Sequence, residues 1–393
     1  MVFNKLEQHQ YVMIYRINAA TNFYVNTSTS IPELASILWN KFNSFGLELK
    51  PKKRWLTFLP AIIIKMIRVS RIIGIFIIRK LNSKRDLIYS DKNGQVAIKR
   101  QSNDYMSLKL FDLHEKVVVT YDKGNDKFYE TVDNLKKLAC NSFAPNIYWV
   151  DYNKKCYTEE YIDIAPAQKW DEGLKLASNF IIAIVNSSPI YYCTVECYLS
   201  SLEYTVSDKY FFNPLVHDKA KYILNSFNYS YDKLSEHCGE KLLISFSHGD
   251  PSRKNILPSK GKTIGIDWEH SKYRPLLYDL LFLLVISRKF CFNNNSFTDF
   301  KKEIDESFEL FTRKINCEID LSSADIERYF HCFNLEYLQW NINKNMVYLN
   351  ESDAFNRLDR GVYSVNHIKK CESFFFINEG GIKSNDFTAD SGY

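Results

Sequence analysis

The fold of this chain is decided by the stretch His248-Gly249-Asp250-Pro251-Ser252-Arg253-Lys254-Asn255. Asp250 is followed five residues later by Asn255 and seventeen residues later by Asp267. Asp267 comes directly after a strand-like run, Thr263-Ile264-Gly265-Ile266. A carboxylate can accept a proton, and carboxylate and carboxamide oxygens suit a hard divalent cation. The spacing therefore predicts a loop and a following strand that together hold one base and two metal ligands.

The composition is that of a globular protein large enough for two lobes and a sizeable core. The chain has 393 residues, of which 46% are hydrophobic and 15% aromatic. Its formal net charge of +5 is small for this length, and the sequence shows no Arg-rich arm or RNA-binding signature. We therefore expect no nucleic-acid partner.

Nine cysteines are scattered along the chain, and none belongs to a Cys-x-x-Cys pair. Cys193 and Cys197 could share a helix face, but two thiols do not make a zinc site. An odd and unpatterned set of cysteines favours reduced thiols. The segment from Met1 to Glu7 lacks the apolar core of a signal peptide. Together these features predict a cytoplasmic protein.

Residues 54–80 form a basic and apolar segment that is rich in Ile. Its longest uncharged run is about ten residues, against the roughly 20 needed to span a bilayer. On a helical projection its basic residues fall within about half the circumference: Lys65, Arg68, Arg71 and Arg79. Two interpretations stay open. The segment contacts an anionic membrane surface peripherally, at the inner face, or it packs on the rest of the protein with its Lys and Arg stems along apolar surface.

Short strands and one helix are predicted between residues 84 and 163. The strands are expected at 95–99, 107–111, 116–121, 146–150 and 156–162. The helix lies between the third and fourth strands and carries Glu130. Its apolar stripe consists of Phe128, Val132, Leu135 and Leu138. Earlier in the chain, residues 11–15 are strand-like and a helix begins after a capping Ser30.

The second half of the chain is predicted to be largely helical, with a few strands around the opening motif. Residues 165–245 are expected to be mostly helix, including 219–238. The remaining expectations are a strand at 242–246, a buried helix start at 275–285 and helices at 298–315 and 323–343. The polar tail from about residue 380 is expected to be disordered.

The motifs resemble the aminoglycoside phosphotransferase and choline kinase branch of the protein-kinase-like superfamily. That branch writes its catalytic loop as HGDxxxxN, where protein kinases have HRDxxxxN. The stretches Ile266-Asp267-Trp268-Glu269 and Tyr278-Asp279-Leu280 match its metal-binding strand end and the helix start that follows. The match covers about residues 85–345 and is sharpest over 242–285. The chain also resembles, less closely, relatives from bacterial surface-polysaccharide gene clusters.

The resemblance implies an α+β, bilobal, protein-kinase-like fold, with a small β-rich N-lobe, a mostly helical C-lobe and an extra N-terminal region. The expected boundaries are residues 1–83 for the N-terminal region, 84–163 for the N-lobe, 164–379 for the C-lobe and 380–393 for the tail.

The resemblance also implies roles in the loop. Asp250 would be the base, and Asn255 and Asp267 would hold magnesium. His248 would stabilise the loop, and Asp279 would tie the helix start to it.

For nucleotide binding, the resemblance implies that Glu130 is the helix glutamate that normally pairs with a strand lysine. Glu160 to Ile162 would be the hinge, whose backbone could pair with an adenine edge. ATP is expected in the cleft between residues 95–162 and 242–270.

The strand lysine is ambiguous, because Thr120 stands where the pattern of the third strand places it. Lys99 ends a Val-Ala-Ile-Lys sequence on the first strand, and Lys109 lies on the second. Both candidates stay open. Arg253, inside the loop, is a further candidate contact for the transferred phosphate.

The function implied is transfer of the γ-phosphate of ATP, with Mg2+, to a hydroxyl of a small molecule or a sugar or polysaccharide precursor. Choline, ethanolamine and aminoglycosides are alternative acceptors, and an aminoglycoside would require an acidic wall such as residues 298–340 could offer. The ambiguous lysine leaves a catalytically silent, nucleotide-binding kinase-like scaffold as the alternative function. A third hypothesis is a membrane-associated structural subunit that uses residues 54–80.

Overall fold

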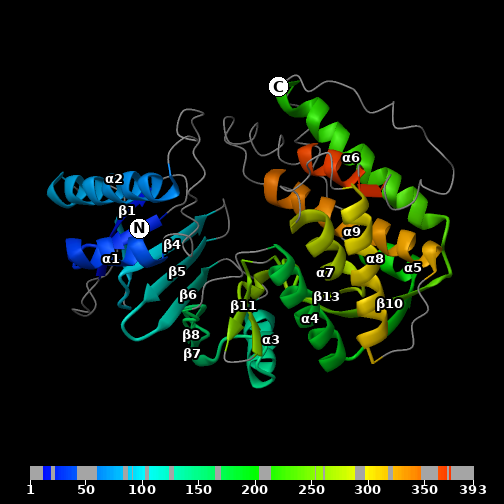
Figure 1. The fold of residues 1–393 in the computed structure, drawn as a ribbon, viewed down its shortest axis with the longest axis horizontal. Coiled ribbons are helices and arrows are strands. Elements are labelled where there is room, and N and C mark those ends of the chain that lie inside the picture. The colour runs from blue at the N-terminus through cyan, green and yellow to red at the C-terminus, as the bar shows by residue number, and fades with distance from the viewer. Residues whose placement is uncertain are drawn as a thin grey trace. The chain divides into compact units, whose positions relative to one another are not determined.

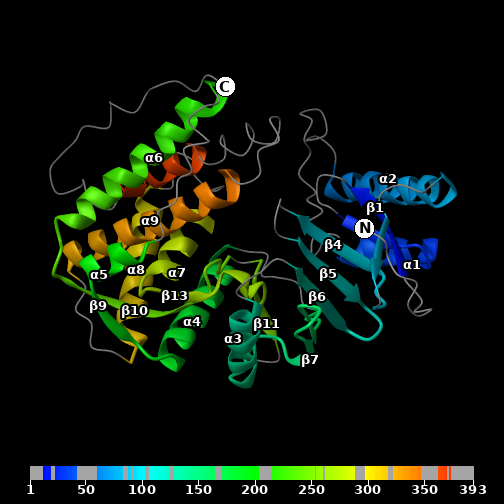
Figure 2. The same ribbon diagram turned by 180° about the vertical axis from the view of Figure 1, so that it is seen from behind.

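An eight-stranded antiparallel sheet dominates the first of two units in the computed structural model, Met1–Ala165 and Pro166–Tyr393, here called unit 1 and unit 2 (Figures 1 and 2). Unit 2 is mostly helical, so the predicted α+β class is confirmed. The structure describes residues 12–18, 23–41, 60–82, 87–90, 92–101, 106–123, 128–163, 170–202, 214–252, 254–259, 262–287, 297–316, 322–346, 362–369 and 371–372. Arg253, residues 54–59 and the tail 380–393 lie outside these ranges.

The strands of unit 1 follow the order β3-β1-β2-β4-β5-β6-β8-β7 across the sheet. Their bounds are β1 Val12–Asn18, β2 Phe23–Asn26, β3 Leu87–Ser90, β4 Val96–Gln101, β5 Met106–Asp112, β6 Val117–Lys123, β7 Ile147–Asp151 and β8 Cys156–Glu160. The predicted sequence of three strands, a helix and two strands is therefore confirmed as β4 to β8. The strand near the N-terminus joins this same sheet through β2, which pairs with β4.

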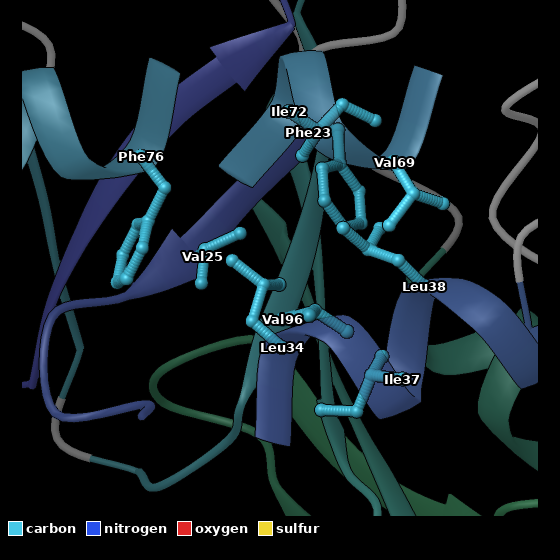
Figure 3. Packing of buried hydrophobic residues seen from close by; sticks show 9 residues of the cluster. All are labelled: Phe23, Val25, Leu34, Ile37, Leu38, Val69, Ile72, Phe76 and Val96. Carbon is cyan, nitrogen blue, oxygen red and sulfur yellow. The ribbon is translucent and has the colours of Figure 1, made fainter. Parts of the chain in front are cut away.

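Two helices, α1 (Ile31–Lys41) and α2 (Ala61–Asn82), pack next to each other beside the N-terminal strands (Figure 1). The predicted Ser30 cap is confirmed, because its hydroxyl accepts from the backbone N–H of Glu33 at 3.3 Å. Figure 3 shows the apolar cluster between these helices and strands β2 and β4. The cluster consists of Phe23, Val25, Leu34, Ile37, Leu38, Val69, Ile72, Phe76 and Val96.

The third helix of unit 1, α3 (Phe128–Cys140), buries the stripe that its sequence predicts: Phe128, Val132, Leu135 and Leu138. Its first turn contacts the β7–β8 hairpin through aromatic rings, with Phe128 and Tyr157 centred 6.3 Å apart. The sequence period of about 3.6 residues therefore located both the helix and its buried face.

Unit 2 contains the predicted helices and additional short strands. The helices are α4 Trp170–Ser187, α5 Val195–Ser201, α6 Pro214–Ser235, α7 Tyr278–Leu281 with a π-helical continuation to Ser287, α8 Phe297–Lys314 and α9 Ser323–Met346. One sheet has the order β13-β10-β9, from β9 Tyr191–Thr194, β10 Lys241–Ser247 and β13 Lys272–Pro275. A hairpin pairs β11 Ile256–Ser259 with β12 Lys262–Gly265. The described part of the segment 165–245 is thus largely helical as expected but also supplies β9.

Helix α9 is deeply buried over its central part. Residues 328–338 are buried without interruption, so this helix has no solvent-facing side over three turns. Two of its buried polar side chains have partners: Arg328 forms ion pairs with Glu240 and Asp325, and the Tyr329 hydroxyl accepts from the Leu243 N–H at 2.9 Å. Pairing of this kind is what allows polar groups to be buried.

All seven cysteines in the described ranges are free thiols. In unit 1, Cys140 is exposed at the end of α3 and Cys156 is buried in β8. Among the described helices, none is both long enough and apolar enough to cross a lipid bilayer.

Candidate active site

The loop that follows β10 is held at its start by the carboxylate of Asp279 on α7. One oxygen of Asp279 accepts from the Ser247 hydroxyl at 2.7 Å and from the Gly249 N–H at 2.9 Å. The other oxygen accepts from the His248 N–H at 2.6 Å. Asp279 is 4% exposed, so these bonds compensate a buried charge that would otherwise be costly. This position agrees with the tie between helix start and loop that the sequence predicts.

His248 is buried and forms hydrogen bonds through both ring nitrogens. Its Nε2 lies 3.0 Å from the Ile266 carbonyl oxygen, and its Nδ1 accepts from the Asp250 N–H at 3.3 Å. This pattern requires a neutral ring that carries its proton on Nε2. Burial lowers the pKa of His248, which favours the same neutral form. The ring therefore joins the loop to the end of the following hairpin and is placed for support rather than for proton transfer.

Two glycines allow close packing around this histidine. Gly249 has φ of +86°, and a Cβ atom there would lie 2.4 Å from the His270 carbonyl oxygen. A Cβ atom on Gly265 would lie 2.6 Å from the Phe180 ring and 2.9 Å from that of Trp268. Trp268 packs on His248 with ring centres 4.3 Å apart and donates from Nε1 to the Gly265 carbonyl at 2.7 Å. The loop therefore packs closely on a group of aromatic rings.

The hairpin β11–β12 brings the other two motif residues next to the loop. Asn255 precedes β11, and its carbonyl accepts from the Ile266 N–H at 2.8 Å, directly before Asp267. The Asn255 side chain donates from Nδ2 to the Asp250 carbonyl at 3.0 Å. Asp267 adopts the left-handed conformation, with φ of 62° and ψ of 51°, which is uncommon outside glycine. Local hydrogen bonds therefore gather Asp250, Asn255 and Asp267 into one cluster.

The donor set of this cluster fits a small, hard divalent cation. Because Asn255 uses its amide nitrogen within the loop, its Oδ1 atom is the one that can face a ligand. The described part of the chain contains no group of three or more His, Cys, Asp or Glu side chains suited to a metal. A magnesium ion needs no such group, since it binds one or two protein oxygens and completes its shell with water and phosphate oxygens.

A buried ion pair next to the loop had no signal in the sequence. Arg274 on β13 donates to the Ser247 hydroxyl at 3.3 Å and lies 4.6 Å from the centre of the Tyr278 ring. Its Nε is 3.5 Å from a carboxylate oxygen of Glu336 on α9, and both side chains are 7% exposed. Lys272 reaches the same oxygen at 2.7 Å from a more exposed position. A single arginine in a short strand forms no sequence motif, so the sequence does not predict its ion pair with a glutamate of a distant helix.

In unit 1, the register of the sheet separates the two candidate lysines. Lys109 on β5 is the direct partner of Thr120 on β6, so these two share one face of the sheet. Lys99 on β4 pairs with Leu108, which in turn pairs with Tyr121. Because side chains alternate along a strand, position 99 belongs to the opposite face from Thr120. Thr120 itself is buried, and its hydroxyl has no hydrogen-bond partner within the described ranges.

Glu130, the predicted partner of that lysine, lies in the first turn of α3 and is exposed. It forms no ion pair with a lysine among the residues that the structure describes. Its position one turn from the helix start leaves it on the side away from the buried stripe. The pairing of Glu130 with a strand lysine therefore stays a prediction.

The predicted hinge is fixed to its neighbours on one side. The Glu160 carboxylate accepts from the Asn146 side chain at 2.8 Å, and the Tyr161 N–H donates to the Lys116 carbonyl at 2.8 Å. Lys41 of α1 lies over the Tyr161 ring at 4.9 Å and forms an ion pair with Asp163. Ile162 is half-buried and has no hydrogen bond to another described residue.

The comparisons give relatives by structure only: no protein-family model and no curated protein matches the chain. A choline kinase from Streptococcus pneumoniae is similar at 16% identity with a TM-score of 0.44, covering 68% of this chain and 91% of that one. A microcompartment-associated aminopropanol kinase gives 13% identity, a TM-score of 0.44 and coverage of 73% and 94%.

Spectinomycin phosphotransferase, solved in complex with ADP and spectinomycin, gives 12% identity, a TM-score of 0.43 and coverage of 73% and 94%. All three neighbours are kinases or phosphotransferases of small molecules by name. With TM-scores below 0.5, the likeness assigns no role to any residue here. The roles discussed below rest on the contacts of the loop and the register of the sheet.

Proposed function

We propose that this chain is an ATP-dependent phosphotransferase that moves the γ-phosphate of ATP to a hydroxyl group of a small molecule. The observation that carries the proposal is the cluster of Asp250, Asn255 and Asp267, which hydrogen bonds of the loop backbone and of the Asn255 and His248 side chains hold together. Phosphoryl transfer depends mainly on the positioning of the reactants and on neutralisation of charge. A rigid loop with one base and two metal ligands can supply both.

Asp250 is the residue that we assign as the base. Its carboxylate is half-buried, and its backbone is fixed from both sides by His248 and Asn255. In this role it orients the acceptor hydroxyl and takes up its proton as the oxygen attacks the γ-phosphate. Asn255 and Asp267 would hold Mg2+, which supplies positive charge to the phosphate oxygens when it is bound. Asp279 and His248 keep the loop in shape.

For the nucleotide, we assign Lys109 in preference to Lys99 as the lysine of unit 1. The register places Lys109 on the same face as Thr120, where the motif expects the lysine, whereas position 99 is on the other face. For the adenine edge we assign the hinge residues Glu160, through its carbonyl because its N–H donates to the Asn146 carbonyl at 2.9 Å, and Ile162. Glu130 and Arg253 stay proposals from sequence, since the first is exposed and unpaired with lysine and the second lies outside the described ranges.

The acceptor we propose is a small-molecule alcohol, and more narrowly a sugar or a polysaccharide precursor. An aminoglycoside acceptor gains no support from α8, because Asp305, Glu306 and Glu309 are exposed there, as in a solvated helix face. Glu306 also has a cation four residues away, with Lys302 at 3.7 Å. Contact with a membrane surface would bring a lipid-linked precursor within reach.

The test is phosphate transfer from labelled ATP with Mg2+ to a panel of sugars and amino alcohols, using the full chain. We expect transfer to at least one acceptor and a loss of about 10²–10⁴-fold for Asp250→Asn, which removes the base but keeps the shape. Asp171→Asn, at an exposed position in the first turn of α4, is the matched control and should retain full transfer.

A catalytically silent scaffold is the competing function, favoured by Thr120 at the lysine position and by the lack of an ion pair between Glu130 and a lysine of the described ranges. The silent scaffold predicts nucleotide binding without Asp250-dependent turnover on any acceptor of the panel. Turnover that persists in Asp250→Asn would contradict the role of the base and would trace the activity to a contaminant or to another group.

A further inference from the structure

Helix α2 attaches to unit 1 by one side. Ile64, Val69, Ile72 and Phe76 are buried, and Figure 3 shows the last three reaching into the cluster with α1 and the strands. At 100° per residue these four positions lie on one half of the helix. Lys65 lies on the same half and covers the Trp39 ring of α1 at 4.9 Å. The basic half predicted from the sequence is therefore largely the half that packs on the protein.

The opposite half of α2 is apolar and exposed. Its most exposed side chains are Ile62 at 58%, Ile78 at 59% and Leu81 at 79%. The complete set of exposed apolar residues, here called the outer face of α2, is Ile62, Ile63, Met66, Ile67, Ile77, Ile78 and Leu81. They form two groups, residues 62–67 and 77–81, on one side of a helix that is about 33 Å long at 1.5 Å per residue, and the exposed residues between the groups are Ser70 and Arg71. Exposed apolar side chains gathered on one side of a helix in this way mark a contact site rather than ordinary solvent-facing surface.

The charges around the outer face have a single sign. Helix α2 contains five basic residues and no acidic residue. On the helical projection, Arg71 lies at one edge of the outer face and Lys80 at the other, and both are exposed. An apolar face with a basic residue at each edge is complementary to a surface in which hydrocarbon lies next to negatively charged groups.

We propose that the outer face of α2 docks on an anionic lipid surface, with the helix lying in the plane of the membrane interface. Its apolar side chains would enter the boundary between headgroups and acyl chains, and Arg71 and Lys80 would stay at the level of the anionic headgroups. This arrangement joins the two interpretations that the sequence leaves open, because one half of α2 packs on the protein and the other half is available to lipid. The inference stands independently of the phosphotransfer proposed above.

The charge pattern favours lipid over a second copy of this chain. Two outer faces packed together would also bring their basic edges together, with no acidic residue on either helix to compensate. An acidic membrane surface has no such conflict and adds attraction that depends on salt.

The experiment is flotation of the full chain with vesicles of phosphatidylcholine alone or with added phosphatidylserine. We expect binding to the anionic vesicles that weakens as salt rises. A variant with Met66→Gln, Ile67→Gln, Ile77→Gln and Ile78→Gln should lose binding by about tenfold or more. A second variant, Arg71→Gln with Lys80→Gln, should lose the preference for anionic vesicles and the salt dependence. Ile31→Gln, at a 45% exposed apolar position of α1, is the control that should bind as the wild type does.

Folding is checked by the melting temperature, which the four outer-face substitutions should leave unchanged because these side chains are exposed. The inference is overturned if the wild type does not float with vesicles of either composition, or if the four-glutamine variant floats equally well. It is also overturned if sedimentation shows self-association that the same variant abolishes while lipid binding is lacking, since the outer face would then be a protein interface.

Discussion

Gly249 is the position in the loop where a single methyl group has the largest expected cost. Its φ of +86° is unfavourable for other residues, and a Cβ atom would lie 2.4 Å from the His270 carbonyl oxygen. We expect Gly249→Ala to lower the free energy of unfolding by about 2–4 kcal/mol, as seen by chemical denaturation. Gly239 has a similar φ of +92°, but a Cβ atom added there would meet no described atom within 4 Å, so Gly239→Ala should cost only about 1 kcal/mol. Equal losses of stability in Gly249→Ala and Gly239→Ala would show that the positive φ alone, and not the contact with the His270 carbonyl, determines the cost at both positions.

The choice between Lys109 and Lys99 is also decided at single residues. Because only Lys109 shares a sheet face with Thr120, Lys109→Met should lower kcat/KM for ATP by about 10²-fold or more, by loss of a positive charge near the phosphates. Lys99→Met, on the opposite face, should change it by less than about threefold. Steady-state kinetics with varied ATP separates the two. A larger effect at Lys99 would reverse the assignment.

Which site residues could be predicted from sequence depends on how local their partners are. The proximity of His248, Asn255 and Asp279 was predictable, because they are spaced within one loop and the helix behind it. Arg274 could not be predicted, because its partner Glu336 belongs to a distant helix and neither residue forms part of a motif. The exposed position of Glu130 follows from the periodicity of α3, which places it away from the buried stripe, but periodicity does not predict whether it forms an ion pair with a lysine on a strand.

At the scale of elements, β13 and α9 are joined by the buried pair of Arg274 and Glu336. Removing the carboxylate leaves a buried guanidinium without its counter-charge, so Glu336→Gln should lower the free energy of unfolding by about 3 kcal/mol. Lys272 contacts the same carboxylate but is 45% exposed, so Lys272→Met should cost less than about 1 kcal/mol. Denaturation of the two variants in parallel tests this order. A cost at Lys272 as large as at Glu336 would contradict it.

Helix α9 also gives unit 2 a dependence on pH. Burial, with smaller contributions from Lys233 and His237, lowers the pKa of His331 from its ordinary value near 6.5 to about 4. Above pH 6.5 the ring is neutral in both the folded and the unfolded chain, so its stabilising contribution is complete. As pH falls from 6.5 to 4, His331 takes up a proton in the unfolded chain but not in the folded chain. The free energy of unfolding therefore falls by about 3 kcal/mol.

His331→Gln should reduce this decline in stability, measured by denaturation at a series of pH values between 7 and 4. His248, whose pKa is also lowered by burial, adds a decline of the same sign that the variant leaves in place. A decline as steep in His331→Gln as in the wild type would place its origin elsewhere in the molecule.

The elements that the sequence predicted well are those with a clear period, such as α3, and those that adjoin a motif, such as β10. Helix α9 was placed correctly by length, yet its polar residues gave no sign that it is buried on every side. The reason is that Arg328, Tyr329 and Glu336 are accommodated by partners from other elements. Strand β9 was not separated from its helical surroundings, because four residues are too few to show a period.

At the scale of the whole molecule, binding of nucleotide should be visible as added stability. If Mg2+ and ATP bind the folded chain alone, ATP at a hundred times its Kd should stabilise it by about 2.7 kcal/mol and raise the melting temperature. Asp267→Asn should abolish the rise, because asparagine tolerates the left-handed backbone but lacks the charged ligand. Removal of the metal with EDTA should have the same effect on the wild type, and Asp133→Asn on the exposed side of α3 should have none.

A wild type whose melting temperature does not respond to Mg2+ and ATP would contradict both the phosphotransferase and the silent nucleotide-binding scaffold. A response without turnover would support the scaffold. The overall class and the order of elements from β4 to β8 were predictable, because they follow from local patterns. The pairing of β1 with β3 was not, since Val12 pairs with Ser90 and such long-range register leaves no local pattern.

The distribution of free thiols provides an internal means of observing unit 1. Of its two cysteines, Cys140 is exposed at the end of α3 and Cys156 is only 1% exposed. A thiol-reactive fluorophore applied under native conditions should therefore label unit 1 at one position, without an engineered cysteine there. After replacement of the cysteines of unit 2, the dye would report in real time whether the helix that carries Glu130 moves when nucleotide is added.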